Sequence, residues 1–396
     1  MIDYQRKLYG LLNHCDNLPQ WSQILDECFD PTECKALEQW WQTFSDLPGS
    51  HPTELASSSD RINLHATNTA DRFSTPETAI RHPISGEPCQ IASQLKLEES
   101  DLKEIKRIIQ QFKTDPNLSK EQQDQQIFWW FWRFYPELFA QQNPEALLLP
   151  AHSFIPDCPI PSYASSVSAL VTATASSTTS TSETPYLLLF TFSPIQEFIK
   201  ASRKFVDFWA GSYLLHYLSA QLCWIIADQF GPDALIVPSL WSQEIIDAMM
   251  VKQFDCLNSH QIFSHSFEQF TALRSHPAQR FHQKQSTSLS TAGFPNVITA
   301  LIPGKIATET LGKELSNQLK EHWVKMGDRI RAHICDRVRQ MLAKTSNDQI
   351  FEEFNVSEIE REACERDLDR WRNDRYHWEW NKLWKEQLEH SWEPYW

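Results

Sequence analysis

The residues best suited to chemistry lie where a run of apolar residues gives way to polar and basic ones. The segment YLLLFTF (186–192) is typical of a buried β-strand, and the chain continues directly as SPIQEFIKASRKFVDFWAGSYLL (193–215). Ser193 suits the N-cap of a helix and Pro194 its first turn. Because the backbone N–H groups of a first helical turn lack partners within the helix, this junction predicts a seat for a phosphate or another anion.

Basic side chains and a glycine follow in the same predicted helix. Lys200, Arg203 and Lys204 form a basic cluster, while Gly211 and Ser212 permit the close approach of another helix or of a ligand. A second interpretation is a core helix whose glycine serves packing only. It draws on six large apolar residues of the segment: Ile195, Phe198, Ile199, Phe205, Phe208 and Trp209. The pattern alone leaves both interpretations open.

The composition limits which classes of protein are possible. A chain of 396 residues with 41% hydrophobic and 12% aromatic residues can bury a sizeable core and is long enough for two domains. The net charge of −15 argues against a general polyanion binder, so a nucleic acid would need a local basic patch or a partner subunit. The nine cysteines form no C-x-x-C pair, and the start MIDYQRKLYGLL is neither a signal peptide nor a membrane span. We therefore expect a soluble cytoplasmic protein without a bound structural metal.

The first part of the chain, before the junction, is predicted to be mainly helical. Residues 1–160 have mostly helical spacing, and QIFWWFWRFYPELF (126–139) is apolar nearly all round, which predicts a buried helix. Residues 161–185 are dominated in their second half by Ser, Thr and Ala, a composition that buries little apolar surface. We expect a low-complexity linker there and place the domain boundary in it.

The second part of the chain carries the junction itself. After the strand at 186–192 we expect one helix over 194–229, a short strand within GPDALIVPSL (231–240) and a further strand within FPNVITALIP (294–303). Residues 306–396 are again helical and highly charged. This order predicts an α+β fold, with helices on one face of a mostly antiparallel sheet.

The segment 193–215 resembles the signature of the large, polymerase-like subunit of type III-B CRISPR effector complexes, the Cmr family. That signature is a strand followed by S-P-x-Q-x-F-I, a basic stretch and D-x-W-A-G-S-Y-L-L. Further segments resemble family elements in the same order along the chain: HPISGE, RFYPE, LLLPAHSFIPD, GPDALIVPSL and FPNVITALIP. The resemblance covers nearly the whole chain.

The resemblance implies a fold, a function and a site. The expected domains are a helical HD-like domain (1–160), the linker (161–185), a ferredoxin-like first palm (186–305) and a helical extension of the palm (306–396). The palm would supply one half of a cleft in which an intact family member makes cyclic oligoadenylate from ATP with Mg²⁺ or Mn²⁺. The implied partners are the other complex subunits and, through them, guide and target RNA. The implied nucleotide-binding residues are Ser193, Pro194, Gln196, Ser212 and Tyr213, beside the basic patch of Lys200, Arg203 and Lys204.

Two departures from the family pattern argue against catalysis by this chain alone. The family motif L-L-H-D reads LLNHCD here, so Asn13 stands in place of the metal-binding His and His14 in place of the Asp. No G-G-D-D motif occurs, so the aspartates that would hold the metal ions of the second palm are missing. We expect no catalytic residue, metal or cofactor in the isolated chain, which looks like the amino-terminal portion of a large subunit. Two alternatives stay open: a synthase completed by a separate second-palm polypeptide, and an HD-type metal-dependent DNA nuclease.

Overall fold

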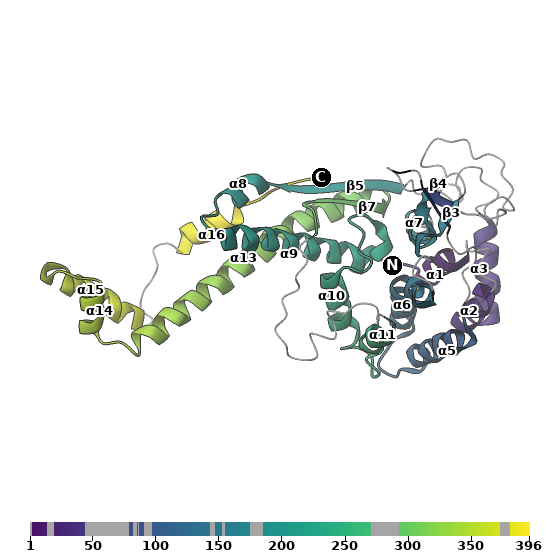
Figure 1. The fold of residues 1–396 in the computed structure, drawn as a ribbon, viewed down its shortest axis with the longest axis horizontal. Helices are drawn as coiled ribbons and strands as arrows, with labels where there is room; N and C mark the ends of the chain where they lie inside the picture. The colour runs from purple at the N-terminus through teal and green to yellow at the C-terminus, as the bar shows by residue number, and fades with distance from the viewer. Residues whose placement is uncertain are drawn as a thin grey trace. The chain divides into compact units, whose positions relative to one another are not determined.

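The computed structural model describes eleven ranges of the chain: residues 2–13, 20–43, 79–81, 85, 87–90, 97–142, 147–152, 155–174, 185–270, 293–372 and 381–396. Figure 1 shows the helices and strands along the chain. They divide into two compact units. The first unit comprises residues 1–190 and 215–312, and the second comprises 191–214 and 313–396. The division falls inside single elements, so the two units share continuous stretches of backbone.

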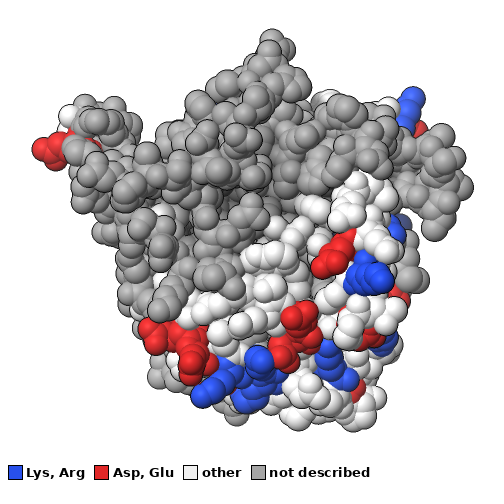
Figure 2. Space-filling view, turned by 90° about the vertical axis from the view of Figure 1, so that its right-hand side faces the viewer, with Lys and Arg blue, Asp and Glu red and all other residues white. Residues whose placement is uncertain are grey.

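The amino-terminal part of the first unit is mainly helical, as the sequence predicts. Its helices are α1 (Tyr4–Asn13), α2 (Trp21–Cys28), α3 (Pro31–Thr43), α5 (Glu99–Thr114), α6 (Lys120–Gln142) and α7 (Ile160–Thr174). Two antiparallel strand pairs accompany them: β1 (Ala79–Arg81) with β2 (Pro88–Gln90), and β3 (Pro150–His152) with β4 (Ile155–Pro159). Along α2, α3 and α5, Lys and Arg side chains are interspersed with Asp and Glu, and no large patch of one sign shows among the described residues of that face (Figure 2).

Helix α6 forms the core of the first unit. Phe128, Trp129, Trp130 and Phe134 are completely buried, which confirms the buried helix predicted from the apolar run at 126–139. The aromatic rings meet mostly at steep angles; Trp130 and Phe131 stand at 88° with centroids 5.1 Å apart. Such edge-to-face pairs add to the stability gained from burial.

Helix α7 corrects the sequence prediction of a linker over 161–185. Residues 160–174 form a core helix in which Val167, Ser168 and Ala173 are completely buried, and residues 175–184 lie outside the described ranges. A Cβ atom at Gly10 of α1 would lie 2.7 Å from Val171 Cγ2, so the two helices approach more closely than larger side chains would allow. The small residues that suggested a disordered linker in the sequence thus allow tight helix packing in the folded structure.

The second half of the chain supplies a four-stranded sheet. Its strands are β5 (Pro185–Ser193), β6 (Leu235–Val237), β7 (Val297–Pro303) and β8 (Glu393–Tyr395), in the spatial order β6-β7-β5-β8. Strand β6 pairs antiparallel with β7, and β5 pairs antiparallel with β8. The structure is therefore α+β. The strands predicted at 186–192, within 231–240 and within 294–303 are confirmed, whereas β8 was not predicted.

Helices fill the connections between these strands. After β5 come α8 (Ile195–Lys200), α9 (Phe205–Phe230) and the 3-10 turn η4 (Pro232–Ala234); after β6 come α10 (Glu244–Phe254) and α11 (Ile262–Phe270). After β7 come α13 (Lys305–Leu342), α14 (Asn347–Glu353), α15 (Glu358–Arg372) and α16 (Asn381–Glu389). None of the described helices is long and apolar enough to cross a membrane.

The single helix predicted over 194–229 is in fact two helices. Helix α8 ends at Lys200, and α9 begins at Phe205 after a basic loop. Helix α9 then runs through Gly211 without a break. The Asp207 side chain accepts a hydrogen bond from the Lys204 backbone N–H at 3.2 Å, which favours the start of α9 at this point.

Candidate functional site

The candidate residues Ser193, Pro194 and Gln196 lie at the end of β5 and the start of α8, in the second unit. Ser193 is the last residue of β5 and pairs with Glu393 of β8, so the junction is fixed to the sheet by backbone pairing. Pro194 and Gln196 are exposed. The strand that the sequence predicts before the junction is therefore present.

The capping prediction at this junction is wrong in detail. The N-cap residue of α8 is Pro194 rather than Ser193, and no side chain caps the helix. Proline has no side-chain oxygen to accept a hydrogen bond from the first turn. Helix α8 has only six residues, so its end concentrates less positive charge than the long helix predicted from sequence would.

An aromatic cluster supports the junction from within the second unit. It consists of Phe192, Phe198, Trp323 and Trp392. Phe198 of α8 stands edge-on to Trp323 and to Trp392, with centroids 5.6 and 5.2 Å apart. Trp392 also meets Phe192 of β5 at 5.5 Å and is buried. A tryptophan close to the end of the chain thus anchors the start of α8, a role that its sequence position did not reveal.

The candidates Ser212 and Tyr213 lie on α9, both half-buried. Phe198 connects this part of α9 with α8, because a Cβ atom at Gly211 would lie 3.5 Å from Phe198 Cε1. That separation is an ordinary van der Waals contact, so the absence of a side chain at Gly211 is not demanded by this neighbour. Tyr213 stacks on Trp209 with centroids 5.5 Å apart and an interplanar angle of 21°. The structure thus brings the two groups of candidates onto adjoining helices.

The basic patch of Lys200, Arg203 and Lys204 surrounds the loop between α8 and α9, and all three side chains are exposed. Large apolar side chains follow at once: Phe205 is 83% exposed, and Phe208 and Trp209 are about half exposed. The sequence interpretation of a core helix is therefore wrong for this first part of α9. Exposed aromatic rings beside cations form a surface that a partner could cover.

The sheet itself presents an apolar open face in the first unit. Along β5, Leu188 and Phe190 are buried, whereas Leu187 is 63% exposed and Leu189 is 55% exposed. Exposed apolar surface continues on the neighbouring strand β7 at Val297. Because side chains alternate between the two faces of a strand, one face of this sheet is covered and the other faces outward.

A buried ion pair joins the amino-terminal helices of the first unit to the turn η4, which precedes β6. Lys7 of α1 lies 2.8 Å from Asp233 of η4, measured from Nζ to Oδ2, and both side chains are completely buried. Lys7 Nζ also donates a hydrogen bond to Thr172 Oγ1 at 2.8 Å. Burial raises the pKa of Asp233 and lowers the pKa of Lys7, and in each case the charge of the partner offsets part of the shift.

A second buried network uses Arg133 and Glu137 of the segment RFYPE. The Arg133 guanidinium binds Asp247 of α10 through two hydrogen bonds of 2.8 and 3.0 Å, and its Nη1 reaches Glu137 at 2.9 Å. Arg133 is completely buried, and the nearby carboxylates hold its pKa above the usual range against the effect of burial. This part of the family-like pattern has a structural role here, because it ties α6 to α10.

The degenerate HD position is only partly visible. Asn13 is the last residue of α1, and His14 lies outside the described residues. Within the described ranges, no three His, Cys, Asp or Glu side chains gather as the ligands of a metal ion would. The prediction that this position binds no metal remains a prediction.

Part of the chain that includes the junction is similar to known proteins. Residues 187–328 match the family model of CRISPR-associated protein Cmr2, N-terminal. The CRISPR system Cmr subunit Cmr2 of Pyrococcus furiosus is 32% identical over 171 residues, which cover 37% of this chain and 17% of that protein. The chain therefore spans about a sixth of the length of this curated relative.

Two solved structures share the fold. A cryo-EM structure of type III-B Cmr-beta in the apo state matches 86% of this chain and 34% of its own, with 15% identity and a TM-score of 0.53. A cryo-EM structure of type III-B Cmr-beta bound to cognate target RNA matches 72% of this chain and 28% of its own, with 17% identity and a TM-score of 0.50. At these identities the likeness is one of fold.

Proposed function

We propose that this chain belongs to the Cmr2 family of CRISPR-associated proteins and is a component of an RNA-guided type III-B effector complex. Within it, the chain contributes the non-catalytic palm half of a nucleotide-binding cleft and docks to neighbouring subunits. The observation that carries the proposal is the position of the signature 193–215 directly after β5. The outward face of that strand carries exposed apolar side chains.

The order of elements supports a ferredoxin-like palm. The chain runs β5, α9, β6, β7, α13 and β8, which is the β-α-β-β-α-β succession of that fold. The strands lie in the order β6-β7-β5-β8, so the first and last strands of the succession are neighbours. The segment matched to the family begins in β5 and ends in α13.

The open sheet face supports docking of a second palm. Contiguous exposed apolar surface can mark an interaction site, and Leu187 and Leu189 project from one face of the strand that leads to the junction. ATP with Mg²⁺ or Mn²⁺ would be held between the two palms, and the metal-binding aspartates would come from the second one. Ser193, Pro194, Gln196, Ser212 and Tyr213 would contact the triphosphate or the base.

The partners follow from the same assignment. One relative of the same fold is a type III-B complex bound to target RNA. We propose that this chain meets RNA through its partner subunits, in keeping with a net charge of −15. The exposed loop with Lys200, Arg203 and Lys204, together with Phe205, is a docking surface for one of these subunits.

Copurification and ATP turnover test the proposal. The chain is coexpressed with the other complex subunits and with a polypeptide that carries a G-G-D-D palm, and oligoadenylate formation is measured with Mg²⁺ or Mn²⁺. The isolated chain should give no turnover, whereas the mixture should give oligoadenylate. Leu187→Asp and Leu189→Asp should abolish copurification of the second palm, while Leu383→Asp, on an exposed position of α16, should not. Turnover by the isolated chain would contradict the proposal.

The HD-type nuclease alternative makes a separate prediction. If the degenerate position still bound a metal, Mn²⁺ or Ni²⁺ would support cleavage of single-stranded DNA, and His14→Ala would abolish it. We expect no cleavage, because Asn13 is a poor ligand for a transition metal.

A further inference from the structure

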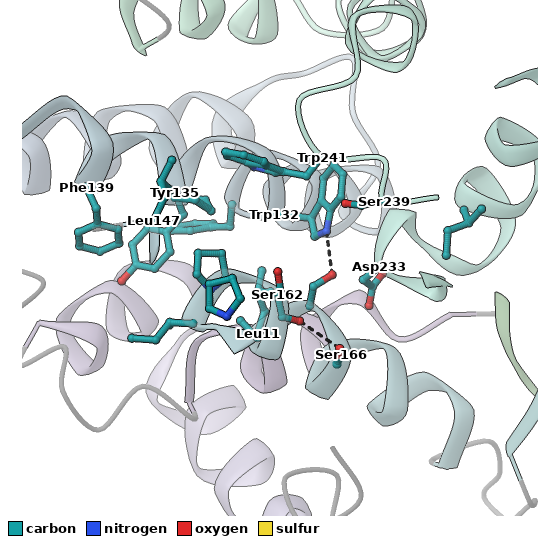
Figure 3. A pocket seen from close by; sticks show the side chains of 18 of the residues that line it. Leu11, Trp132, Tyr135, Phe139, Leu147, Ser162, Ser166, Asp233, Ser239 and Trp241 are labelled. Atoms are coloured by element: carbon teal, nitrogen blue, oxygen red, sulfur yellow. Dashed lines mark hydrogen bonds between the residues drawn. The ribbon is translucent and has the colours of Figure 1, made fainter. Parts of the chain in front are cut away.

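A cavity of about 270 Å³ lies within the first unit, and none of the residues proposed for the nucleotide cleft lines it (Figure 3). It is bounded by α6, the first turns of α7, η4 and the residues after β6. Ser162 and Ser239 line it and are exposed, so they mark its mouth. Asp233 also lines it and is 2% exposed, so it marks a buried end.

The walls of the cavity are mostly aromatic. Phe131, Trp132, Tyr135 and Phe139 project from α6, and Trp241 adds an indole ring. Figure 3 shows Trp132, Tyr135 and Trp241 across the cavity from Leu11 and Ser162. Apolar walls with a few polar groups are the usual construction of a small-molecule site.

Hydrogen bonds fix two of these rings in place. Trp132 Nε1 donates to Ser165 Oγ at 3.2 Å, and Trp241 Nε1 donates to the Arg133 carbonyl oxygen at 3.1 Å. Both indole N–H groups are therefore used within the wall and offer no donor to a ligand. The carboxylate of Asp233, held by Lys7, is the charged acceptor of the lining.

The volume limits the size of the ligand. A cavity of about 150 Å³ is enough to hold a benzene molecule. The cavity here, at about 270 Å³, has room for two fused rings but is smaller than most pockets for drug-sized ligands, which begin at roughly 300 Å³. An uncharged, flat ring system would fit this cavity, because it would contact the apolar walls without burying a charge.

We propose that this cavity binds a two-ring aromatic heterocycle, with its rings among Trp132, Tyr135 and Trp241 and a ring N–H directed at Asp233. The site is separate from the proposed nucleotide cleft and does not depend on it. A ring nitrogen matters because a bare hydrocarbon would offer the Asp233 carboxylate no hydrogen-bond donor beyond the Lys7 ammonium.

Binding of indole to the full chain tests the proposal, with saturation-transfer NMR as the readout. Indole should bind saturably, and 1-methylindole, which lacks the N–H, should bind about tenfold more weakly. Ser239→Trp at the mouth and Ala164→Leu inside the cavity should each weaken indole binding at least about fivefold, because both fill the space. Ala343→Leu, at an exposed position in the turn just after α13, is the matched control and should leave binding unchanged.

Three results would overturn the proposal: no saturable indole binding, equal binding of indole and 1-methylindole, or unchanged binding in both filled variants. Ser239 is exposed, so its variant keeps the test usable if Ala164→Leu fails to fold. Oligoadenylate formation in the reconstituted complex should be the same for Ser239→Trp and the unaltered chain, which separates this site from the nucleotide cleft.

Discussion

Lys7 and Asp233 form an ion pair of 2.8 Å with no exposed side-chain surface, between the first helix of the chain and the turn before β6. Several kcal/mol of desolvation oppose such a pair unless its polar atoms find partners. Thr172 accepts a hydrogen bond from Lys7, and the Lys7 ammonium lies 5.3 Å from the centroid of the Phe128 ring. The pair therefore connects the amino-terminal helix α1 to the turn η4 before β6 within the first unit.

Removing one partner of this pair should be costly. Lys7→Met leaves the Asp233 carboxylate buried without its cation, and we expect the free energy of unfolding to fall by about 3–5 kcal/mol. The double variant Lys7→Met with Asp233→Leu should recover most of that loss, because no unpaired charge remains. Urea unfolding followed by circular dichroism measures both; a single variant as stable as the unaltered chain would refute the role of the pair.

Gly231 should tolerate no side chain. Its φ of +93° lies in the region that favours glycine, and a Cβ atom there would lie 2.5 Å from Asp233 Oδ1 and 2.7 Å from Lys7 Cε. We expect Gly231→Ala to cost about 1–3 kcal/mol of stability, or more if the ion pair is displaced. Gly293→Ala is the control, because a Cβ atom there meets nothing within 4 Å, and it should change stability by less than about 1 kcal/mol.

His216 should make stability depend on pH. Its Nδ1 accepts hydrogen bonds from the backbone N–H groups of Gly293 and Phe294, both at 3.1 Å, so the folded state needs this nitrogen unprotonated. Burial lowers the pKa of His216 below its ordinary value of about 6.5. The unfolded chain therefore binds a proton more readily than the folded one, and acid destabilises the fold.

The pH measurement compares urea unfolding at about pH 7.5 and 5.5. The free energy of unfolding should fall by up to about 1.4 kcal/mol per pH unit below the unfolded pKa of His216. His216→Gln should remove this part of the slope, whereas His333→Gln, at an exposed position of α13, should keep it. An identical slope in His216→Gln would show that other groups cause it.

Trp392 should matter far more than its place near the chain end suggests. It is buried and lies 5.2 Å from both Phe198 and Trp323, measured between ring centroids. Trp392→Ala should cost about 3–5 kcal/mol because it leaves a cavity beneath α8. Trp396→Ala serves as the control, since its side chain is about half exposed and should change stability little. Thermal unfolding of the two variants measures both changes. Equal losses of stability in the two variants would contradict the supporting role of Trp392.

Local patterns were enough to predict much of the fold. The buried helix at 126–139, the strand at 186–192 and the strand within 294–303 could be predicted because apolar runs and their flanking turn residues reflect burial directly. The junction at Ser193 and Pro194 could be located for the same reason. Its chemistry as a nucleotide site stays a prediction.

Other features depend on partners that lie far away in the chain. Ser168 and Val171 were predicted to lie in a linker. In the structure they pack against Lys7 and Gly10 of α1. The sequence suggests that Phe205 is a core residue. In the structure its side chain is exposed, and no neighbour among the described residues covers it. Sequence by itself determined the helix at 126–139 and the strands at 186–192 and within 294–303, because those choices depend mainly on adjacent residues. Only the tertiary structure decided which charges pair, which rings support the junction and which surface stays open, because burial depends on residues brought together by folding.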